Sequence, residues 1–362
     1  MRPSVVEVDL RAIRHNAATL VDAVAPAKLC AVVKADGYGH GDVPVAEAAV
    51  EGGAAWLAVA LVEEGVRLRE AGIEAPILVL SEPALDDAAA IVNWRLTPTA
   101  YRTEFVDALD ATGAPIGVHV KVDTGMHRVG ADAATAIEVA AAVSNGVNLR
   151  LEGLWTHFAV AEDDAEFTKR QTEELTAVAS RLRGAGMPPD MLHAANSAGA
   201  LGYPEARLDM VRCGIALYGL APGPAFEANL RPAMAVKSKV SFSRRLPAEA
   251  RPSYGRVRSL PAESTVATVP IGYADGVARR LGATGGEVLI GGNRHPFAGT
   301  VTMDHIVVDC GDAEVNVGDD VVVLGRQGDE EITADEWARR LETINYEIVC
   351  DFGPRLPRRY LT

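Results

Sequence analysis

The feature that most constrains the fold is an alternation of short apolar runs with longer segments of helical composition over about the first 220 residues. Eight apolar runs occur there: 30–33, 56–60, 77–80, 95–99, 116–122, 151–156, 191–194 and 208–215. The segments between them carry apolar residues at three- and four-residue spacing, as in 43–52, 62–72, 85–93, 131–147 and 165–184. Because parallel strands need a crossover of about a dozen residues, this rhythm predicts a parallel sheet covered by helices. Eight units predict an α/β fold of the (β/α)8, TIM-like barrel type.

A doubly wound sheet is the rival for the same rhythm. Such a sheet normally carries a glycine-rich fingerprint after its first strand. No G-x-G-x-x-G followed by an acidic residue occurs at that place, and no GxxxxGK[ST] occurs anywhere in the chain. The barrel is therefore the favoured interpretation.

A second, mostly β domain is expected after about residue 222. Its apolar runs are short and separated by turn residues: 235–242, 264–271, 287–290, 306–308 and 321–324. Thr333-Ala-Asp-Glu336 is a capping box and predicts a helix that runs to about Glu342. Pro222-Gly223-Pro224 is the best linker candidate. We expect a cofactor-binding barrel over 1–222 and a β domain over 223–362, leaving open that a first strand at 4–9 packs with the β domain.

Composition excludes several classes of protein. With 48% hydrophobic and 23% charged residues in 362, the chain is not a disordered protein, and its length suggests about two domains. Acidic residues exceed basic ones by 49 − 35 = 14, so the surface field should repel nucleic acid and anionic lipid.

The cysteines and the N-terminus indicate a compartment. The four cysteines are far apart in sequence, which favours neither a disulfide framework nor a metal cluster. The first ten residues do not read as a signal peptide, and no apolar stretch is long enough to span a membrane. We expect a cytoplasmic protein without a metal.

Polar residues follow several of the predicted strands, at the barrel face where active sites lie. Lys34 directly follows the apolar run 30–33. Desolvation at this place would lower the pKa of its amine and make it a nucleophile. A lysine that extends from a strand end into solvent is the alternative, and it has the same sequence pattern. Gly214, in the last strand with Arg212, allows a phosphate group to approach the backbone, and an ordinary turn is the alternative. The other groups are Lys121 to Gly130, Trp155-Thr-His157 and His193-Ala-Ala-Asn196-Ser197. His157 alone would be read as a structural histidine.

Three motifs stand out in the β domain. They are Ser253-Tyr254-Gly255, Gly272-Tyr273-Ala-Asp-Gly276 and Thr302-Met303-Asp304. By physical reasoning alone, each is a turn with a surface aromatic or a core methionine.

Together these residues resemble a known family over practically the whole chain. Val33-Lys34-Ala-Asp-Gly-Tyr38-Gly-His-Gly41 is similar to the cofactor-lysine signature of the bacterial alanine racemases, which are fold-type III enzymes dependent on pyridoxal 5′-phosphate. Four further blocks match in the same order: Lys121 to Gly130, Arg212 to Gly219, Gly272 to Gly276 and Thr302 to Asp304. The resemblance implies an isomerase that interconverts L- and D-alanine and supplies D-alanine for peptidoglycan.

The resemblance also implies residue roles. Lys34 would bind the cofactor as a Schiff base and act as one catalytic base, with Tyr254 as the other. Cofactor binding would further involve Tyr38, His157, Asn196, Ser197, Arg212, Gly214 and Ile215. Arg128 would bind the substrate carboxylate, with Lys121 as a lysine that the family often carbamylates. Met303 and Tyr273, like Tyr254, would come from the partner subunit of a homodimer with shared sites.

Arg212 bears on the reaction type. An arginine facing the pyridine nitrogen leaves that nitrogen unprotonated, which favours racemisation, whereas related decarboxylases carry a carboxylate at this place. One block departs from the family pattern: Pro354 stands where a phosphate-contacting tyrosine is expected, and Tyr360 cannot be assumed to replace it. The alternatives are a racemase of serine or another amino acid, and a non-catalytic protein that binds the cofactor.

Overall fold

The chain folds into two compact units, which are described separately. The structure is a computed structural model and describes residues 2–223, 225–226 and 228–362. One unit comprises Arg11–Gly37 and Asp42–Pro232, and the other combines the segment ending at Leu10 with Tyr38–Gly41 and Ala233–Thr362. Pro224 of the expected linker lies outside the described residues. The boundary at residue 222 stays a prediction.

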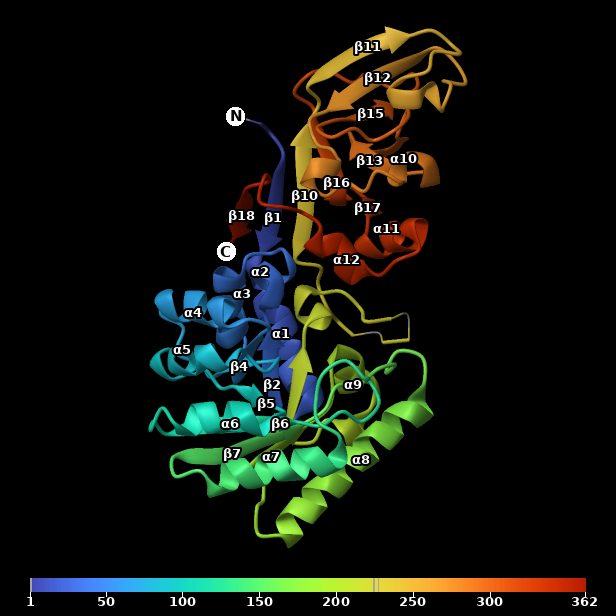
Figure 1. Ribbon diagram of the computed structural model, residues 1–362. Helices are drawn as coiled ribbons and strands as arrows, with labels where there is room; N and C mark the ends of the chain where they lie inside the picture. The colour runs from blue at the N-terminus through green and yellow to red at the C-terminus, as the bar shows by residue number, and fades with distance from the viewer. Residues whose placement is uncertain (1, 224, 227) are drawn as a thin grey trace. The chain divides into compact units, whose positions relative to one another are not determined.

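The first unit is the barrel (Figure 1). Within the described residues it has eight strands: β2 (Lys28–Val32), β3 (Trp56–Val59), β4 (Ile77–Val79), β5 (Thr99–Ala100), β6 (Ile116–Lys121), β7 (Leu149–Trp155), β8 (Met191–His193) and β9 (Met210–Cys213). They pair in parallel in the orders β4-β3-β2-β9 and β5-β6-β7-β8.

Backbone contacts join the two four-stranded sheets on both sides. A parallel bridge pairs Leu78 with Thr97, which connects β4 to the segment before β5. On the other side, Arg212 N donates to Ala195 O at 2.9 Å, and Asp209 N donates to Leu192 O at 3.1 Å. The sheet closes on itself, so the predicted barrel is confirmed.

The barrel helices follow the strands in alternation, with Asp132 and Asp164 accepting backbone N–H groups as N-caps of α7 and α8. The helices are α1 (Leu10–Val24), α2 (Lys34–Tyr38), α3 (Asp42–Glu51), α4 (Val62–Glu70), α5 (Ala88–Asn93), α6 (Thr103–Asp110), α7 (Ala133–Asn145), α8 (Ala165–Gly184) and α9 (Ser197–Gly202), with short turns η1 (Leu85–Asp87), η2 (Pro204–Ala206) and η3 (Ile215–Tyr218). None of the described helices has both the length and the apolar character needed to cross a membrane.

The second unit is mostly β. Its strands are β1 (Val5–Asp9), β10 (Met234–Lys239), β11 (Phe242–Leu246), β12 (Ser264–Val269), β13 (Glu287–Ile290), β14 (Asn293–Pro296), β15 (Ile306–Asp309), β16 (Asp320–Gln327), β17 (Glu330–Ile332) and β18 (Arg358–Leu361). One sheet has the order β14-β13-β16-β10-β1-β18, with β17 paired to β16, and a smaller sheet has the order β11-β12-β15. β1 pairs antiparallel with β10 and parallel with β18, so the first strand belongs to this sheet.

Two details of this unit bear on the sequence interpretation. The run 235–242 is split between β10 and β11, because these strands belong to different sheets. Thr333 Oγ1 accepts from Glu336 N at 3.0 Å and begins α11 (Ala334–Leu341), as the capping box predicts. The remaining helices are α10 (Leu281–Thr284) and α12 (Asn345–Cys350), with turns η4 (Tyr254–Arg256) and η5 (Tyr273–Asp275).

Candidate active site

Lys34 lies at the carboxyl end of β2, where the backbone turns in an unusual way. Ala35, Asp36 and Gly37 have φ angles of 54°, 53° and 59°, which is a left-handed turn. Each non-glycine residue in this conformation costs roughly 1–2 kcal/mol. Such strain persists where the surroundings over-determine the conformation, and it is often found at functional sites.

A buried carboxylate holds this turn. Glu64 Oε1 accepts from Ala35 N at 2.7 Å, while Glu64 Oε2 accepts from Ala60 N at 2.8 Å and Leu61 N at 3.1 Å. One side chain thereby ties the start of α4 to the residue that follows Lys34. Sequence reasoning missed Glu64, and its position in the first turn of a helix after a barrel strand was the available signal.

Arg212, on β9, is the central cation of the barrel site, with a side chain that is almost completely buried. Its Nη2 donates to Thr156 O at 2.8 Å and Ala194 O at 2.9 Å, and its guanidinium lies 4.5 Å from the centre of the Trp155 ring. Burial lowers the pKa of Arg212 to about 10, so it stays charged at neutral pH. Within the described part of the chain, its Nε–H has no hydrogen-bond acceptor.

Three imidazoles are connected to Arg212. Nη2 lies 3.2 Å from His157 Nδ1, and Nη1 lies 2.8 Å from His193 Nδ1. Behind them, His193 Nε2 lies 2.8 Å from His119 Nδ1. Burial, followed by the charge of Arg212, lowers the pKa of His119 to about 3 and those of His157 and His193 well below the usual value. All three are therefore neutral near pH 7.

The hydrogen bonds around His193 assign the tautomers of the two buried imidazoles behind Arg212, which are those of His193 and His119. Because a guanidinium only donates, His193 Nδ1 is an acceptor and its proton lies on Nε2, which donates to His119 Nδ1. His193 was noted in the sequence without a role, and His119 was not selected there. The opposing position on β7 is Gly153, where a Cβ would lie 2.4 Å from His119 Nδ1.

Lys121 is the last residue of β6, and its ammonium nitrogen lies 4.3 Å from the centre of the Trp155 ring. Burial first, then the charges of Arg212 and Arg128, lowers its pKa to about 7. The same charges, together with Lys34, act on His157. Lys34, Lys121, Arg128, His157 and Arg212 are thereby brought together by the fold.

The loop that carries Arg128 is held by its own backbone. Asp123 Oδ1 accepts from Gly125 N and His127 N, both at 3.0 Å. Ala131 N donates back to Lys121 O at 3.0 Å, so the loop returns to the end of β6. Gly130 has φ 126°, and a Cβ there would lie 3.0 Å from Asp123 N.

Small polar groups gather after β8 and β9. Ser197 Oγ accepts from Gly214 N at 3.1 Å and from Ala216 N at 3.3 Å. Asn196 Oδ1 accepts from Gly199 N at 2.9 Å and caps α9. Ile215 is completely buried at the start of η3. The fold thus brings Ser197 and Gly214, which are predicted phosphate ligands, into contact.

The chemistry of this donor set fits pyridoxal 5′-phosphate. The buried side chains of Lys121 and Arg212 favour a bound anion, and Ser197, next to the amides of Gly214 and Ala216, supplies a hydroxyl that can bind phosphate. Lys34 supplies the primary amine that an aldehyde needs, and the free Nε–H of Arg212 suits a ring nitrogen that accepts a hydrogen bond.

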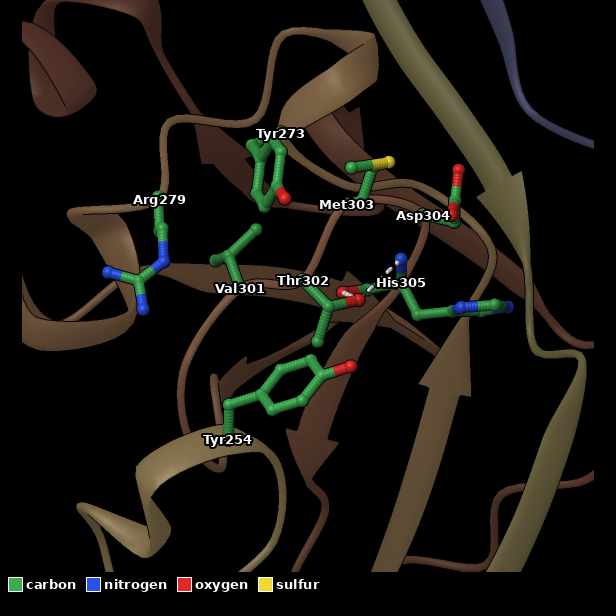
Figure 2. Close-up of a pocket in the computed structure, with 8 residues that line it drawn as sticks. All are labelled: Tyr254, Tyr273, Arg279, Val301, Thr302, Met303, Asp304 and His305. Carbon is green, nitrogen blue, oxygen red and sulfur yellow. Dashed lines mark hydrogen bonds between the residues drawn. The ribbon is translucent and has the colours of Figure 1, made fainter.

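The β unit holds the other predicted residues in one pocket of about 480 Å³. Figure 2 shows Tyr273 and Met303 on one side of Thr302, with the Tyr254 ring on the other. Tyr254 is 72% exposed, Met303 51% and Tyr273 41%. The pocket also contains Arg279 and His305, which the sequence interpretation did not select.

Hydrogen bonds fix the turns that carry these side chains. Ser253 Oγ donates to Thr300 O at 2.6 Å, and Thr300 Oγ1 donates to Tyr254 O at 2.9 Å. Tyr273 N donates to Thr302 O at 2.9 Å, which connects the second motif to the third, while the first motif is bonded to Thr300, two residues before the third. The aromatic rings are therefore presented to solvent from a rigid base.

Tyr38 and Pro354 also belong to the β unit. The Tyr38 ring lies 6.3 Å from that of Tyr346, which is on α12. Pro354 is exposed. Tyr360, on β18, contacts Gly41, where a Cβ would lie 2.0 Å from its hydroxyl oxygen. Phe352, two residues before Pro354, is buried.

The fold and the two clusters define a class: a protein in which a barrel carries a lysine among buried cations and a β unit carries exposed tyrosines. Sequence models of one family match both parts, "Alanine racemase, N-terminal domain" at residues 8–222 and "Alanine racemase, C-terminal domain" at residues 233–360. The chain belongs to the alanine racemase family, which confirms the predicted resemblance and its enzyme class, an isomerase.

Individual relatives agree with the family models. An alanine racemase of Symbiobacterium thermophilum is 46% identical over 368 residues, which cover 99% of this chain and 97% of that protein. The crystal structure of alanine racemase from E. faecalis has a TM-score of 0.94 at 37% identity, covering 99% and 98% of the two chains. A histidine racemase from Leuconostoc mesenteroides has a TM-score of 0.91 at 28% identity, covering 100% and 98%.

Proposed function

We propose that the chain is a pyridoxal 5′-phosphate-dependent alanine racemase that interconverts L- and D-alanine and supplies D-alanine for peptidoglycan. The observation that carries this proposal is the position of Lys34 at the end of β2, among buried cations and neutral imidazoles. The alanine racemases among its full-length relatives support the choice of substrate.

The cofactor, when bound, withdraws electrons from the Cα of an attached amino acid and makes its proton removable. The chain then has to hold a proton acceptor and donor on each side of Cα. Lys34 Nζ serves one side, first by binding the cofactor and then by moving the proton. The turn held by Glu64 directs the chain out of β2 directly after this lysine.

Arg212 would hold the ring nitrogen of the cofactor through its Nε–H. Its Nη1 contacts His193, and its Nη2 contacts Thr156 O, Ala194 O and His157, so the guanidinium is held in place from both terminal nitrogens. With a pKa of about 10, it does not give up a proton at neutral pH. With this donor beside it, the ring nitrogen of a bound cofactor would stay unprotonated, and the cofactor would then favour return of the proton over side reactions.

Tyr254 Oη serves the opposite side of Cα. A phenol is a weak base at neutral pH, so it needs a cationic or hydrogen-bonding environment to act. Its exposure in the isolated chain supports a role at a site completed by another subunit. Tyr273 and Met303, from the same pocket, would shape the space around the substrate.

Arg128 binds the substrate carboxylate, as a guanidinium does through two parallel hydrogen bonds. Lys121 lies close enough to be affected by its charge. With a pKa of about 7, a large part of the Lys121 amine is neutral at physiological pH, which is the form that reacts with carbon dioxide. Carbamylation would reverse the charge of Lys121 and pair it with Arg128.

Tyr38, Ser197, the amides of Gly214 and Ile215, and the neighbouring Asn196 hold the phosphate. His157 fixes Arg212 from the side opposite His193. We further propose a homodimer in the cytoplasm, with Tyr254, Tyr273 and Met303 of each chain completing the site of its partner. The acidic charge balance favours neither nucleic acid nor a membrane as a partner.

The test is a racemisation assay with purified, cofactor-loaded protein in deuterated water. L-alanine should yield D-alanine with deuterium at Cα, and Lys34→Ala should remove both the turnover and the visible absorption of the lysine-bound cofactor. Racemase activity retained by Lys34→Ala would contradict the mechanism.

A panel of L-amino acids decides the substrate. Histidine and serine belong in it, since a histidine racemase shares this fold at 28% identity. Faster turnover of either one than of alanine would replace the proposed substrate. Cofactor binding without turnover of any amino acid would instead indicate a non-catalytic protein.

A further inference from the structure

Arg358, the first residue of β18, donates hydrogen bonds from all three guanidinium nitrogens to backbone carbonyl oxygens. Nε and Nη2 donate to Gly39 O at 3.1 and 2.9 Å. Nη1 donates to Gly353 O at 2.7 Å and Leu356 O at 2.9 Å, and Nη2 also donates to Phe352 O. All five N–H donors of the side chain are engaged. A half-buried arginine thus joins the C-terminal segment to the turn that contains Tyr38.

The turn is packed against the C-terminal segment at further points. Gly39 has φ 78°, and a Cβ there would lie 2.5 Å from Val349 O of α12. Gly41 has φ 95° and lies against the Tyr360 hydroxyl. A larger residue fits at neither position without a shift of these neighbours, so the backbone at Arg358's acceptor and two residues beyond it is closely packed against the C-terminal segment.

Tyr38 depends on this arrangement. Its own φ is 51°, a conformation that a bulky residue adopts only when its surroundings impose it. The carbonyl held by Arg358 belongs to Gly39 and therefore lies in the peptide between Gly39 and His40. The peptide that directly follows Tyr38 is held by His40, whose Nδ1 lies 2.9 Å from Tyr38 O. Arg358 and His40 thus hold the two consecutive peptides after Tyr38, and with them the turn that carries its side chain.

We infer that Arg358 is a positioning residue that fixes Tyr38 for contact with the phosphate of the cofactor. The inference rests on the proposed role of Tyr38 as a phosphate ligand. Arg358 itself is not assigned any contact with cofactor or substrate.

The sharpest variant is Arg358→Lys. It keeps the positive charge and most of the apolar stem, but an ammonium is a single point and cannot reach four carbonyls in the plane of a guanidinium fork. The matched control is Arg359→Lys, because Arg359 is the next residue on β18, is exposed and pairs with Glu7 Oε1 at 3.2 Å.

The measurement is cofactor affinity, with the visible absorption band as readout, for pyridoxal 5′-phosphate and for pyridoxal, which lacks the phosphate. Arg358→Lys should bind pyridoxal 5′-phosphate about tenfold more weakly, the order expected for one lost hydrogen bond to a charged group. Its affinity for pyridoxal should stay within about twofold of the parent, and Arg359→Lys should change neither value. Equal weakening for both ligands would mean a general structural role and would overturn the inference, as would unchanged affinity for both.

A double-mutant cycle with Tyr38→Phe separates the inference from the proposal on which it rests. If Arg358 acts through Tyr38, Arg358→Lys adds no further loss in the Tyr38→Phe background, whereas additive losses would overturn the inference. If Tyr38→Phe alone leaves affinity unchanged, the proposed phosphate role of Tyr38 fails instead, and the inference fails with it. Should Arg358→Lys not fold, Arg358→Gln is measured in its place with the same outcomes.

Discussion

At the scale of single residues, the barrel site is defined by which of its groups are protonated at neutral pH. Arg212 keeps its proton, the imidazoles of His157 and His193 are neutral, and Lys121 titrates near neutrality. For Lys121, His157 and His193 the lowered pKa has burial as its first cause, followed by nearby positive charge, whereas for Arg212 burial alone lowers the pKa. Burying these positively charged groups without a bound anion therefore destabilises the protein.

Tyr254→Phe should affect one direction of the reaction more than the other. The variant keeps the ring but loses the hydroxyl proposed to move the proton, a contribution of about 10²–10⁴-fold for a general acid or base. Exchange of the Cα proton with solvent, measured separately from L- and D-alanine, should be lost mainly for the enantiomer whose proton faces Tyr254. Equal loss from both enantiomers would argue against two separate bases.

The pKa of Lys121 predicts a pH dependence of stability. Folding lowers this pKa from 10.5 to about 7, so between these values the unfolded chain binds more protons than the folded one. Stability of the cofactor-free protein should then rise with pH through this window. Lys121→Met removes the titrating group, so it should stabilise the empty protein most below pH 7 and progressively less towards pH 10.5.

Urea unfolding of cofactor-free protein at several pH values, in buffers free of carbon dioxide, measures this effect. Lys169→Met is a suitable control, because Lys169 is an exposed lysine of the same barrel unit. A stability gain in Lys121→Met that does not vary between pH 6 and 10 would contradict the depressed pKa.

At the scale of elements, the ends of strands and helices matter most. The sequence located the barrel strands because strands buried on both faces are nearly continuous apolar runs. It predicted the start of α11, because a capping box is a local signal. The weakest case is β5, expected within 95–99 and observed at Thr99–Ala100, where backbone pairing rather than composition sets the ends.

Glu64 connects the turn after β2 to the start of α4, so its replacement should lower the stability of the protein. Glu64→Gln leaves at most one acceptor oxygen for three backbone N–H groups, those of Ala35, Ala60 and Leu61. We expect a loss of about 1–3 kcal/mol in the free energy of unfolding. Glu63→Gln, at the exposed neighbouring position, should cost less than about 0.5 kcal/mol.

Urea unfolding of the two variants gives this comparison. Because Glu64 also holds the turn after Lys34, the Glu64→Gln protein should in addition bind the cofactor more weakly. Equal stability of the two glutamine variants would show that the contact with Ala35 contributes nothing.

At the scale of the whole molecule, Lys34 and Tyr254 belong to different compact units. In the proposed homodimer, each site takes Lys34 from one chain and Tyr254 from the other. Two inactive variants should then complement each other. Mixed dimers of Lys34→Ala with Tyr254→Phe contain one intact site, so random reassembly should restore roughly a quarter of the parent activity.

The measurement is racemase activity after the two variants are dissociated, mixed and reassembled, with each variant reassembled alone as a control. If both bases of a site came from the same chain, no mixed dimer would have an intact site. Absence of recovered activity in a mixture shown to contain mixed dimers would therefore reject the shared site.

The sequence by itself determined the barrel, the β domain and the identity of the chemical groups, because periodicity, strand-end positions and short motifs are local properties of the chain. Only the tertiary structure decided which supporting residues hold the predicted site residues and their turns in place. Glu64 contacts Ala35, His119 contacts His193, and Arg358 contacts Gly39, across 29, 74 and 319 positions of sequence. The acidic balance of the whole chain likewise gave no sign of the buried cations around Arg212. Burial and charge coupling depend on distances in space, and these exist only once the chain has folded.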